Sequence, residues 1–264
     1  MKIGFFGCGN MGTAIAEGFK KNYPENSGLE LYFFTPSKTK AKDLADRLGG
    51  HFVSFAVDMP KDLDWYILAF KPQSLMDFNF AFNSNAKVLS VLAGTGIEAL
   101  EKKFQINHVA RLMPNTPSSI GFGANLFYAN FDSEDMKKLL AALGKLFTMK
   151  SEKEMDIITS FSGSGPALVF EYARLFEKHL IALNAGASND AREIIAQTFL
   201  GSAKLMEKAV QENISFETLR EQVTSKKGVT FEALQIMEKN GLDHIMGGAF
   251  TAAYKRTLEI KKGI

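Results

Sequence analysis

The stretch Lys2-Ile3-Gly4-Phe5-Phe6-Gly7-Cys8-Gly9-Asn10-Met11-Gly12 carries the strongest fold signal in this sequence. Its apolar start predicts a β-strand that runs into the pattern Gly-x-Gly-x-x-Gly, and the amphipathic segment 13–21 predicts a helix. In this order the first glycine permits a tight turn, the second lets a pyrophosphate approach, and the third lets the helix pack closely. The helix N-terminus would present N–H groups to phosphates. We therefore predict a dinucleotide site at Gly7, Gly9, Asn10, Met11 and Gly12, with an ordinary glycine-rich turn as the alternative.

Composition indicates a globular protein of two domains. The chain has 264 residues, is 46% hydrophobic and carries a net charge of +2, which gives no electrostatic argument for nucleic acid. No run reaches the roughly 18 apolar residues of a membrane span, and a strand at 2–6 leaves no room for a cleavable signal peptide. The single cysteine, Cys8, fits a reducing cytoplasm, and the four histidines show no metal-ligand spacing. We expect a cytoplasmic protein that binds neither nucleic acid, membranes nor a metal.

Strand and helix patterns alternate through the first part of the chain. Strands are predicted at 29–34, 65–70, 86–92 and 108–112, and helices at 37–48 and 96–104. Such alternation indicates an α/β fold, a doubly wound, mostly parallel sheet of the Rossmann type. In such sheets ligands bind at the carboxyl ends of the strands, which makes 35–38, 71–73 and 93–95 candidate binding segments. We predict a dinucleotide-binding domain over residues 1–160.

The segment after the second predicted strand bears on the choice of cofactor. Folds that prefer NAD usually place a carboxylate here to hold the ribose 2′-hydroxyl, but no carboxylate appears until Asp43. Thr35, Ser37 and Lys38 offer hydroxyl and ammonium groups instead, which suit a 2′-phosphate. This favours NADP, with NADPH preferred over NADH. The alternative is that Ser37 only caps the next helix and the lysine is solvated.

Only helical patterns follow Ser162. Helices are predicted at 167–183, ending near Gly186, and at 188–212, 216–223, 229–239 and 242–261. The pair Asn240-Gly241 is a helix stop signal. We predict an all-helical C-terminal domain over residues 161–264.

Six segments resemble segments of the pyrroline-5-carboxylate reductase family and occur in the same order along the chain. The most specific are RLMPNTP at 111–117 and SGSGPA at 162–167, which match that family's R-x-MPNTP and SGSGPA. The others are AFKPQ at 69–73, SVLAG at 90–94, QT-x-x-G at 197–201 and VTS at 223–225. The resemblance covers nearly the whole chain. It implies a Rossmann-type domain and a helical domain that binds substrate and forms an intertwined homodimer; rings of dimers also occur in that family.

The resemblance also implies an activity. The family reduces the cyclic imine Δ1-pyrroline-5-carboxylate to L-proline with NAD(P)H, the last step of proline biosynthesis. This chemistry needs a held nicotinamide, a carboxylate pocket and a hydrogen-bonding group at the imine nitrogen, and the cofactor supplies the hydride. By resemblance, the cofactor groove also includes Ala69, Lys71, Pro72, Ala93, Gly94 and Asn115. The alternatives are a buried structural lysine at 71 and a merely stiff loop at 114–117.

The loop VTSKKGVT at 223–230 is expected to bind the substrate. By resemblance, Ser225 and the loop N–H groups, including those of Gly228 and Val229, bind the substrate carboxylate. Thr230 is then the catalytic residue that donates to or accepts from the ring nitrogen. An ordinary helix-entry hydroxyl is the alternative role of this threonine.

Lys226 and Lys227 depart from the family pattern, which has Pro-Gly there. If the backbone needs a positive φ at this point, Lys227 is strained by about 1 kcal/mol. The two ammonium groups could strengthen anion binding, admit a substrate with an extra acidic group, or point into water. Two further hypotheses are a reductase of another cyclic imine acid and a non-catalytic, NADP-binding regulatory relative. A β-hydroxyacid dehydrogenase fits poorly, because apolar residues follow Gly165 where that class has a lysine.

Overall fold

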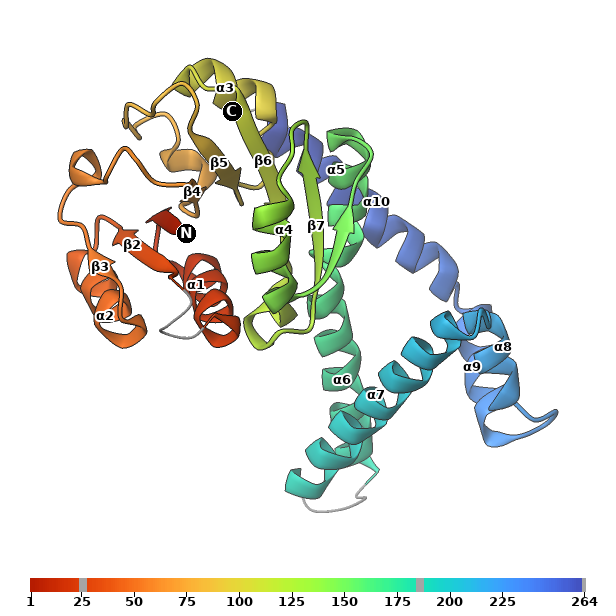
Figure 1. Cartoon of the computed structure of the whole chain (residues 1–264). Coiled ribbons are helices and arrows are strands. Elements are labelled where there is room, and N and C mark those ends of the chain that lie inside the picture. Colours follow the sequence, from red (N-terminus) through yellow and green to blue (C-terminus); the bar gives the residue numbers. More distant parts are fainter. Residues whose placement is uncertain (24–27, 184–187, 263–264) are drawn as a thin grey trace. The chain divides into compact units, whose positions relative to one another are not determined.

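A computed structural model describes residues 1–23, 28–183 and 188–262 of the chain (Figure 1). The chain divides into two compact units. The sheet unit comprises Met1–Pro166 and Ala252–Ile264, and the helical unit comprises Ala167–Thr251. The sequence predicted one boundary at residues 160 and 161, whereas the structure groups the C-terminal segment with the sheet unit. The reason is that Ile260 contacts Gly94 and Lys261 pairs with Asp156, and both partners belong to the sheet unit.

The sheet unit is built on one sheet of eight strands within the part of the chain that the structure describes, in the order β3-β2-β1-β4-β5-β6-β7-β8. The strands are β1 (Lys2–Phe6), β2 (Glu30–Phe34), β3 (His51–Phe52), β4 (Trp65–Leu68), β5 (Lys87–Ser90), β6 (His108–Met113), β7 (Gly123–Ala129) and β8 (Gly144–Thr148). Strand β7 runs antiparallel to β6, and the other neighbours are parallel. The predicted α/β fold is therefore confirmed. The order reverses between β1 and β4, the switch point where such sheets bind ligands.

Helices of the sheet unit connect these strands. They are α1 (Asn10–Asn22), α2 (Lys38–Leu48), α3 (Ile97–Phe104), α4 (Glu134–Leu140) and α5 (Glu152–Ser162). Short 3₁₀ helices are η2 (Ala56–Asp58), η3 (Pro72–Ser74), η4 (Thr116–Ile120) and η5 (Ala141–Leu143). The first three α-helices confirm the sequence predictions within a few residues. Helix α2 ends at Leu48 and is followed by Gly49, which has the left-handed φ of 62° that the stop signal predicts.

Aromatic residues of β1 anchor a core on each face of the sheet. Successive side chains of a strand point to opposite faces, so Phe5 and Phe6 join different clusters. The ring of Phe5 lies 6.3 Å from that of Phe19 and 5.3 Å from that of Phe33, centroid to centroid. The ring of Phe6 lies 4.9 Å from that of Phe78. Strand β1 is thus buried on both faces, which fixes the position of the turn that follows it.

The helical unit contains α6 (Gly165–Ala182), α7 (Ser188–Gln211), α8 (Phe216–Gln222), α9 (Val229–Lys239) and α10 (Leu242–Lys262), of which α6 begins and α10 ends in the sheet unit. These match the predicted helices, while the predicted stop near Gly186 lies outside the described residues. Among the described residues of this unit, the buried hydrophobic ones are Ala191, Ile195 and Ala209. No helix in the described ranges combines the length and apolar character of a membrane span.

We expect Phe5→Ala to lower the free energy of unfolding by about 3–5 kcal/mol, because it removes a ring that is fully buried and leaves a cavity. Phe55→Ala is the matched control, since the Phe55 side chain is 57% exposed. Urea titration of both variants would measure the difference. An equal loss in the two variants would contradict the described core.

Candidate functional site

The turn after β1 has the backbone geometry that close approach of a phosphate requires. Gly7 has a φ of +115°, and a Cβ there would lie 2.4 Å from the carbonyl oxygen of Ala69. A Cβ on Gly12 would lie 2.2 Å from the carbonyl oxygen of Gly7. Packing therefore requires glycine at both positions. Gly9 differs, because a Cβ there would meet nothing within 4 Å, so its missing side chain leaves open space.

That open space lies at the N-terminus of α1. Gly9 is the N-cap residue, no side chain caps the helix, and its first turn contains no acidic residue. The first-turn N–H groups of Asn10, Met11 and Gly12 have no partner within a helix, and the positive end of the helix dipole lies beside them. The structure thus brings the five predicted residues together at an uncapped helix N-terminus, and their binding of a pyrophosphate stays a prediction.

Cys8 has a packing role in this turn. Its side chain is buried, and its Sγ lies 3.8 Å from the carbonyl oxygen of Phe34. Burial raises the pKa of the Cys8 thiol to about 12. The thiol therefore stays protonated and weakly nucleophilic near neutral pH.

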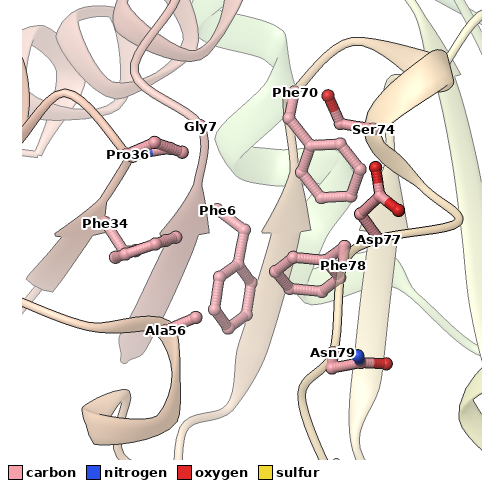
Figure 2. Close-up of a pocket in the computed structure, with 10 residues that line it drawn as sticks. All are labelled: Phe6, Gly7, Phe34, Pro36, Ala56, Phe70, Ser74, Asp77, Phe78 and Asn79. Carbon is pink, nitrogen blue, oxygen red and sulfur yellow. The ribbon is translucent and has the colours of Figure 1, made fainter.

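A pocket of about 460 Å³ lies at the carboxyl ends of β1, β2 and β4 (Figure 2). Figure 2 shows phenyl rings on its walls and three polar side chains along one side. Flat aromatic walls with a few polar groups suit a planar heteroaromatic base. The pocket is lined by Phe6, Gly7, Phe34, Pro36, Ala56, Phe70, Ser74, Asp77, Phe78 and Asn79. Of these residues, Gly7 was predicted as a site residue and Pro36 lies in the predicted candidate segment 35–38.

The segment after β2 borders this pocket through Pro36. Ser37 is the N-cap residue of α2, but its side chain makes no capping hydrogen bond, so its hydroxyl is not used by the helix. Lys38 is exposed, and its Nζ lies 4.1 Å from the centroid of the Phe55 ring. Thr35 is half-buried. Ser37 and Lys38, two of the three residues predicted to meet a 2′-phosphate, are therefore exposed.

The segment after β4 contacts the glycine turn directly. The Ala69 N–H donates to the carbonyl oxygen of Phe6 over 2.8 Å, which places Ala69 beside Gly7. Lys71 is exposed and precedes η3, in which Pro72 is the first residue. The alternative of a buried structural lysine at this position is therefore wrong.

The segments after β5 and β6 have structural partners. Gly94 has a φ of +72°, and both it and half-buried Ala93 follow β5. The Asn115 side chain is buried, donates to the carbonyl oxygen of Ser162 over 3.1 Å and accepts the Ala124 N–H over 3.0 Å. Asn115 thus holds the turn after β6 in place, and its contact with a cofactor stays a prediction.

The loop 223–230 of the helical unit leads into α9. Gly228 is the extended N-cap residue, and its N–H donates to the carbonyl oxygen of Ser225 over 2.9 Å. A Cβ on Gly228 would lie 2.3 Å from Ser225 Oγ, so a side chain there would displace the Ser225 hydroxyl. Val229 and Thr230 are exposed. The first turn of α9 therefore offers N–H groups that no side chain caps.

Lys227 has a φ of +61°, the left-handed value that the family's glycine would adopt easily. A lysine in this conformation carries a steric cost of roughly 1 kcal/mol. Lys226 and Lys227 are both exposed. The described residues contain no group of three or more His, Cys, Asp or Glu that could hold a metal ion.

Comparisons find similarity along the whole chain. A family model described as pyrroline-5-carboxylate reductase dimerisation matches residues 152–260, and one described as NADP oxidoreductase, coenzyme F420-dependent, matches 2–94. The chain is 32% identical to a pyrroline-5-carboxylate reductase of Pasteurella multocida, with 98% of each chain covered. It is also similar to the structure of 1-pyrroline-5-carboxylate reductase from Streptococcus pyogenes, with a TM-score of 0.85, 25% identity and 98% of each chain covered. Pyrroline carboxylate reductase of Plasmodium falciparum, solved with NADP bound, has the same fold, with a TM-score of 0.80, 24% identity, and 99% of this chain and 98% of that chain covered.

We expect Gly9→Ala to weaken binding of NADPH by about tenfold or more, because the methyl group would occupy the space that the pyrophosphate approaches. Its melting temperature should stay unchanged, since the Cβ meets no atom within 4 Å. Gly7→Ala is the contrasting variant and should lower the melting temperature, because its Cβ would clash with the Ala69 carbonyl. Fluorescence titration and thermal unfolding measure the two effects. Equal NADPH affinity in Gly9→Ala and the unmodified protein would contradict a pyrophosphate site here.

Proposed function

This chain belongs to the pyrroline-5-carboxylate reductase family, and we infer that it reduces Δ1-pyrroline-5-carboxylate to L-proline with NAD(P)H. The observation that carries this inference is the similarity to a named reductase over nearly the full length of both chains. The enzyme is therefore an NAD(P)-dependent oxidoreductase of proline biosynthesis. The open space at Gly9 and the uncapped N-terminus of α1 fit the pyrophosphate of the cofactor.

We propose that NADPH is preferred over NADH. The segment after β2 supports this proposal, because it offers the hydroxyls of Thr35 and Ser37 and the exposed ammonium of Lys38. This segment also lacks a carboxylate, a group that would repel a 2′-phosphate. The pocket beside Pro36 is suited to the adenine, and its aromatic walls match a flat base. Ala69, Lys71, Pro72, Ala93, Gly94 and Asn115 complete the proposed cofactor groove.

We propose that the loop 223–230 binds the substrate. The uncapped N–H groups at the start of α9 and the Ser225 hydroxyl are suited to a carboxylate. Gly228 and Val229 contribute backbone to this site, and the exposed hydroxyl of Thr230 would form a hydrogen bond with the ring nitrogen. The ammonium groups of Lys226 and Lys227 add positive charge that favours an anionic substrate.

Catalysis then rests on orientation and hydrogen bonding. When bound, NADPH supplies the hydride for the imine carbon. The chain's own residues fix the pyrophosphate at α1, hold the substrate carboxylate on the loop and hold the ring nitrogen at Thr230. Fixing both reactants in a reactive orientation removes much of the entropic barrier. Because the imine carbon accepts hydride with its nitrogen already protonated, the neutral ring amine forms directly and the reaction needs no strong acid from the protein.

We propose that the oligomer is built from homodimers. Matching the family's dimerisation model supports oligomerisation. The helical unit has an apolar hollow of about 640 Å³ and exposed apolar side chains, including Leu183 at 78% and Phe170 at 63% exposure. A second copy would cover such a surface. The single buried cysteine supports a reducing, cytoplasmic compartment.

The purified protein should oxidise NADPH when racemic pyrroline-5-carboxylate is added, and proline should be the product. Thr230→Val should lower kcat by about 100-fold, because the ring nitrogen loses its hydrogen-bond partner. Thr251→Val, an exposed threonine of α10 in the same unit, is the matched control and should keep full activity. Absorbance at the nicotinamide band and product chromatography measure these results. NADPH binding without turnover in the unmodified protein would contradict the reductase and favour a regulatory relative.

We expect Lys38→Met to raise the KM for NADPH by about tenfold and to leave the KM for NADH unchanged, because only NADPH carries the 2′-phosphate that the ammonium would contact. Lys42→Met, an exposed lysine on the same helix, is the control and should change neither value. Steady-state kinetics with both cofactors checks the prediction. A parallel rise in both KM values would show that Lys38 does not read the 2′-phosphate.

A further inference from the structure

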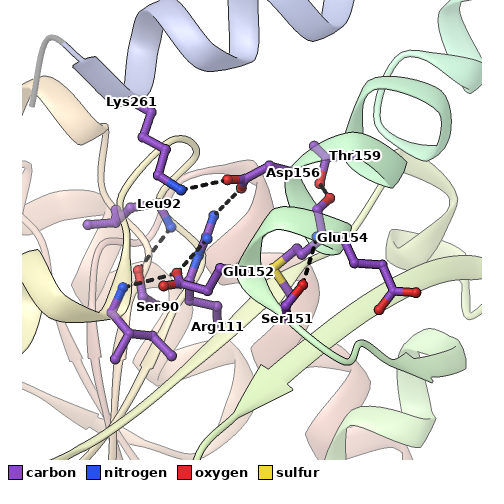
Figure 3. A network of polar contacts seen from close by, with 11 residues as sticks. Ser90, Leu92, Arg111, Ser151, Glu152, Glu154, Asp156, Thr159 and Lys261 are labelled. Carbon is purple, nitrogen blue, oxygen red and sulfur yellow. Dashed lines mark hydrogen bonds and ion pairs between the residues drawn. The ribbon is translucent and has the colours of Figure 1, made fainter.

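A network of charged side chains joins four elements of the sheet unit (Figure 3). Arg111, in β6, donates from Nη1 to Glu152 over 2.7 Å and from Nη2 to Asp156 over 3.3 Å. Glu152 also accepts the N–H of Ile97, at the start of α3, over 3.0 Å. The second oxygen of Asp156 accepts from Nζ of Lys261, in the last turn of α10, over 2.8 Å. The end of the chain is thus tied to the base of the turn after β6.

Burial makes the contact between α10 and α5 more than a surface ion pair. The Asp156 side chain is 4% exposed and that of Lys261 is 40% exposed. Two cations balance two carboxylates, so each buried charge has a partner of opposite sign. Lys261 is the most accessible member of the four, and Asp156 keeps Arg111 as a partner if Lys261 is removed. Substitution of Lys261 therefore perturbs the network with little risk to folding.

The same turn of α10 packs on the loop that follows β5. A Cβ on Gly94 would lie 2.5 Å from Cγ2 of Ile260 and 3.2 Å from the backbone nitrogen of Lys261. At the end of this loop, where α3 begins, Glu152 accepts the N–H of Ile97. The loop 93–96 therefore contacts the last turn of α10 at Gly94 and is fixed at its junction with α3 by Glu152.

The position of the loop 93–96 in the sheet indicates which half of a dinucleotide it would lie beside. Strands β2 and β5 lie on opposite sides of the switch point between β1 and β4. The Gly7 turn takes the pyrophosphate, and the β2 side takes the adenosine half. The nicotinamide half therefore extends toward the carboxyl ends of β4 and β5, where the loop 93–96 lies.

We propose that Asp156 and Lys261 are positioning residues for the nicotinamide half of the cofactor, which they affect by holding the last turn of α10 against Gly94. This inference rests on the proposed cofactor site. It predicts an effect on the nicotinamide half alone, because the adenosine half lies on the other side of the switch point.

The test compares two ligands in the full-length protein. Lys261→Met should raise the Kd of NADPH by about three- to tenfold, because the last turn of α10 would no longer be held against Gly94. It should leave unchanged the Kd of 2′,5′-ADP, which contains only the adenosine half. Lys261→Arg should restore NADPH affinity because it keeps the charge. Lys255→Met, another exposed lysine of α10, should match the unmodified protein for both ligands. Isothermal titration calorimetry measures all four proteins.

The possible outcomes separate this inference from the proposed function. Equal weakening of both ligands by Lys261→Met, or no weakening of either, would overturn the positioning role while the unmodified protein still binds NADPH. Failure of the unmodified protein to bind NADPH would overturn the cofactor site itself and this inference with it. Asp156→Asn provides a second readout. It should weaken the binding of NADPH but not that of 2′,5′-ADP, as Lys261→Met should. If only Lys261→Met had this selective effect, the ion pair would be excluded as the cause.

Discussion

The close approach of backbone segments at Gly7 is the constraint on which the rest of the sheet unit depends. The Gly7 N–H donates to the last residue of β2 over 2.8 Å, while its Cα faces the carbonyl of Ala69 and its own carbonyl faces Gly12. Strands β1, β2 and β4 and helix α1 therefore meet at one residue without a side chain. Burial of Phe5 and Phe6 on opposite faces holds that meeting point rigidly. The proposed phosphate site depends directly on this packing.

Local patterns predicted the parts of the fold that local interactions decide. The apolar runs of β1, β4 and β5 and the glycine stop of α2 are visible in a short window of sequence. Strands β7 and β8 were not predicted, because GANLFYA begins at a glycine and GKLFT carries polar residues at the edge of the sheet. Their strand conformation depends on pairing with β6 and with each other. The two-residue β3 is too short to have a pattern.

The same distinction holds for the candidate site: some of its features could be predicted locally, and others depend on distant neighbours. Residue types indicated the glycine turn. The positive φ now seen at Lys227 was raised only as a condition, by resemblance to a family pattern that has glycine there. They could not indicate that the Asn115 side chain is occupied by Ser162 and Ala124, or that Lys71 is exposed, because those facts depend on distant neighbours. The ion pair between Asp156 and Lys261 spans 105 residues and leaves no trace in sequence spacing. Long-range partners, rather than residue types, are what the sequence leaves undetermined.

The membership of Ala252–Ile264 in the sheet unit has a consequence for the order of events during synthesis. A ribosome releases the segments of β1 to α5 long before it makes the last turn of α10. Throughout that interval the nascent sheet unit lacks the partner of Asp156 and the cover over Gly94. Domains usually fold as soon as they emerge, starting from the N-terminus. This one can collapse early, but it reaches its final packing only after the C-terminal residues have left the ribosomal tunnel.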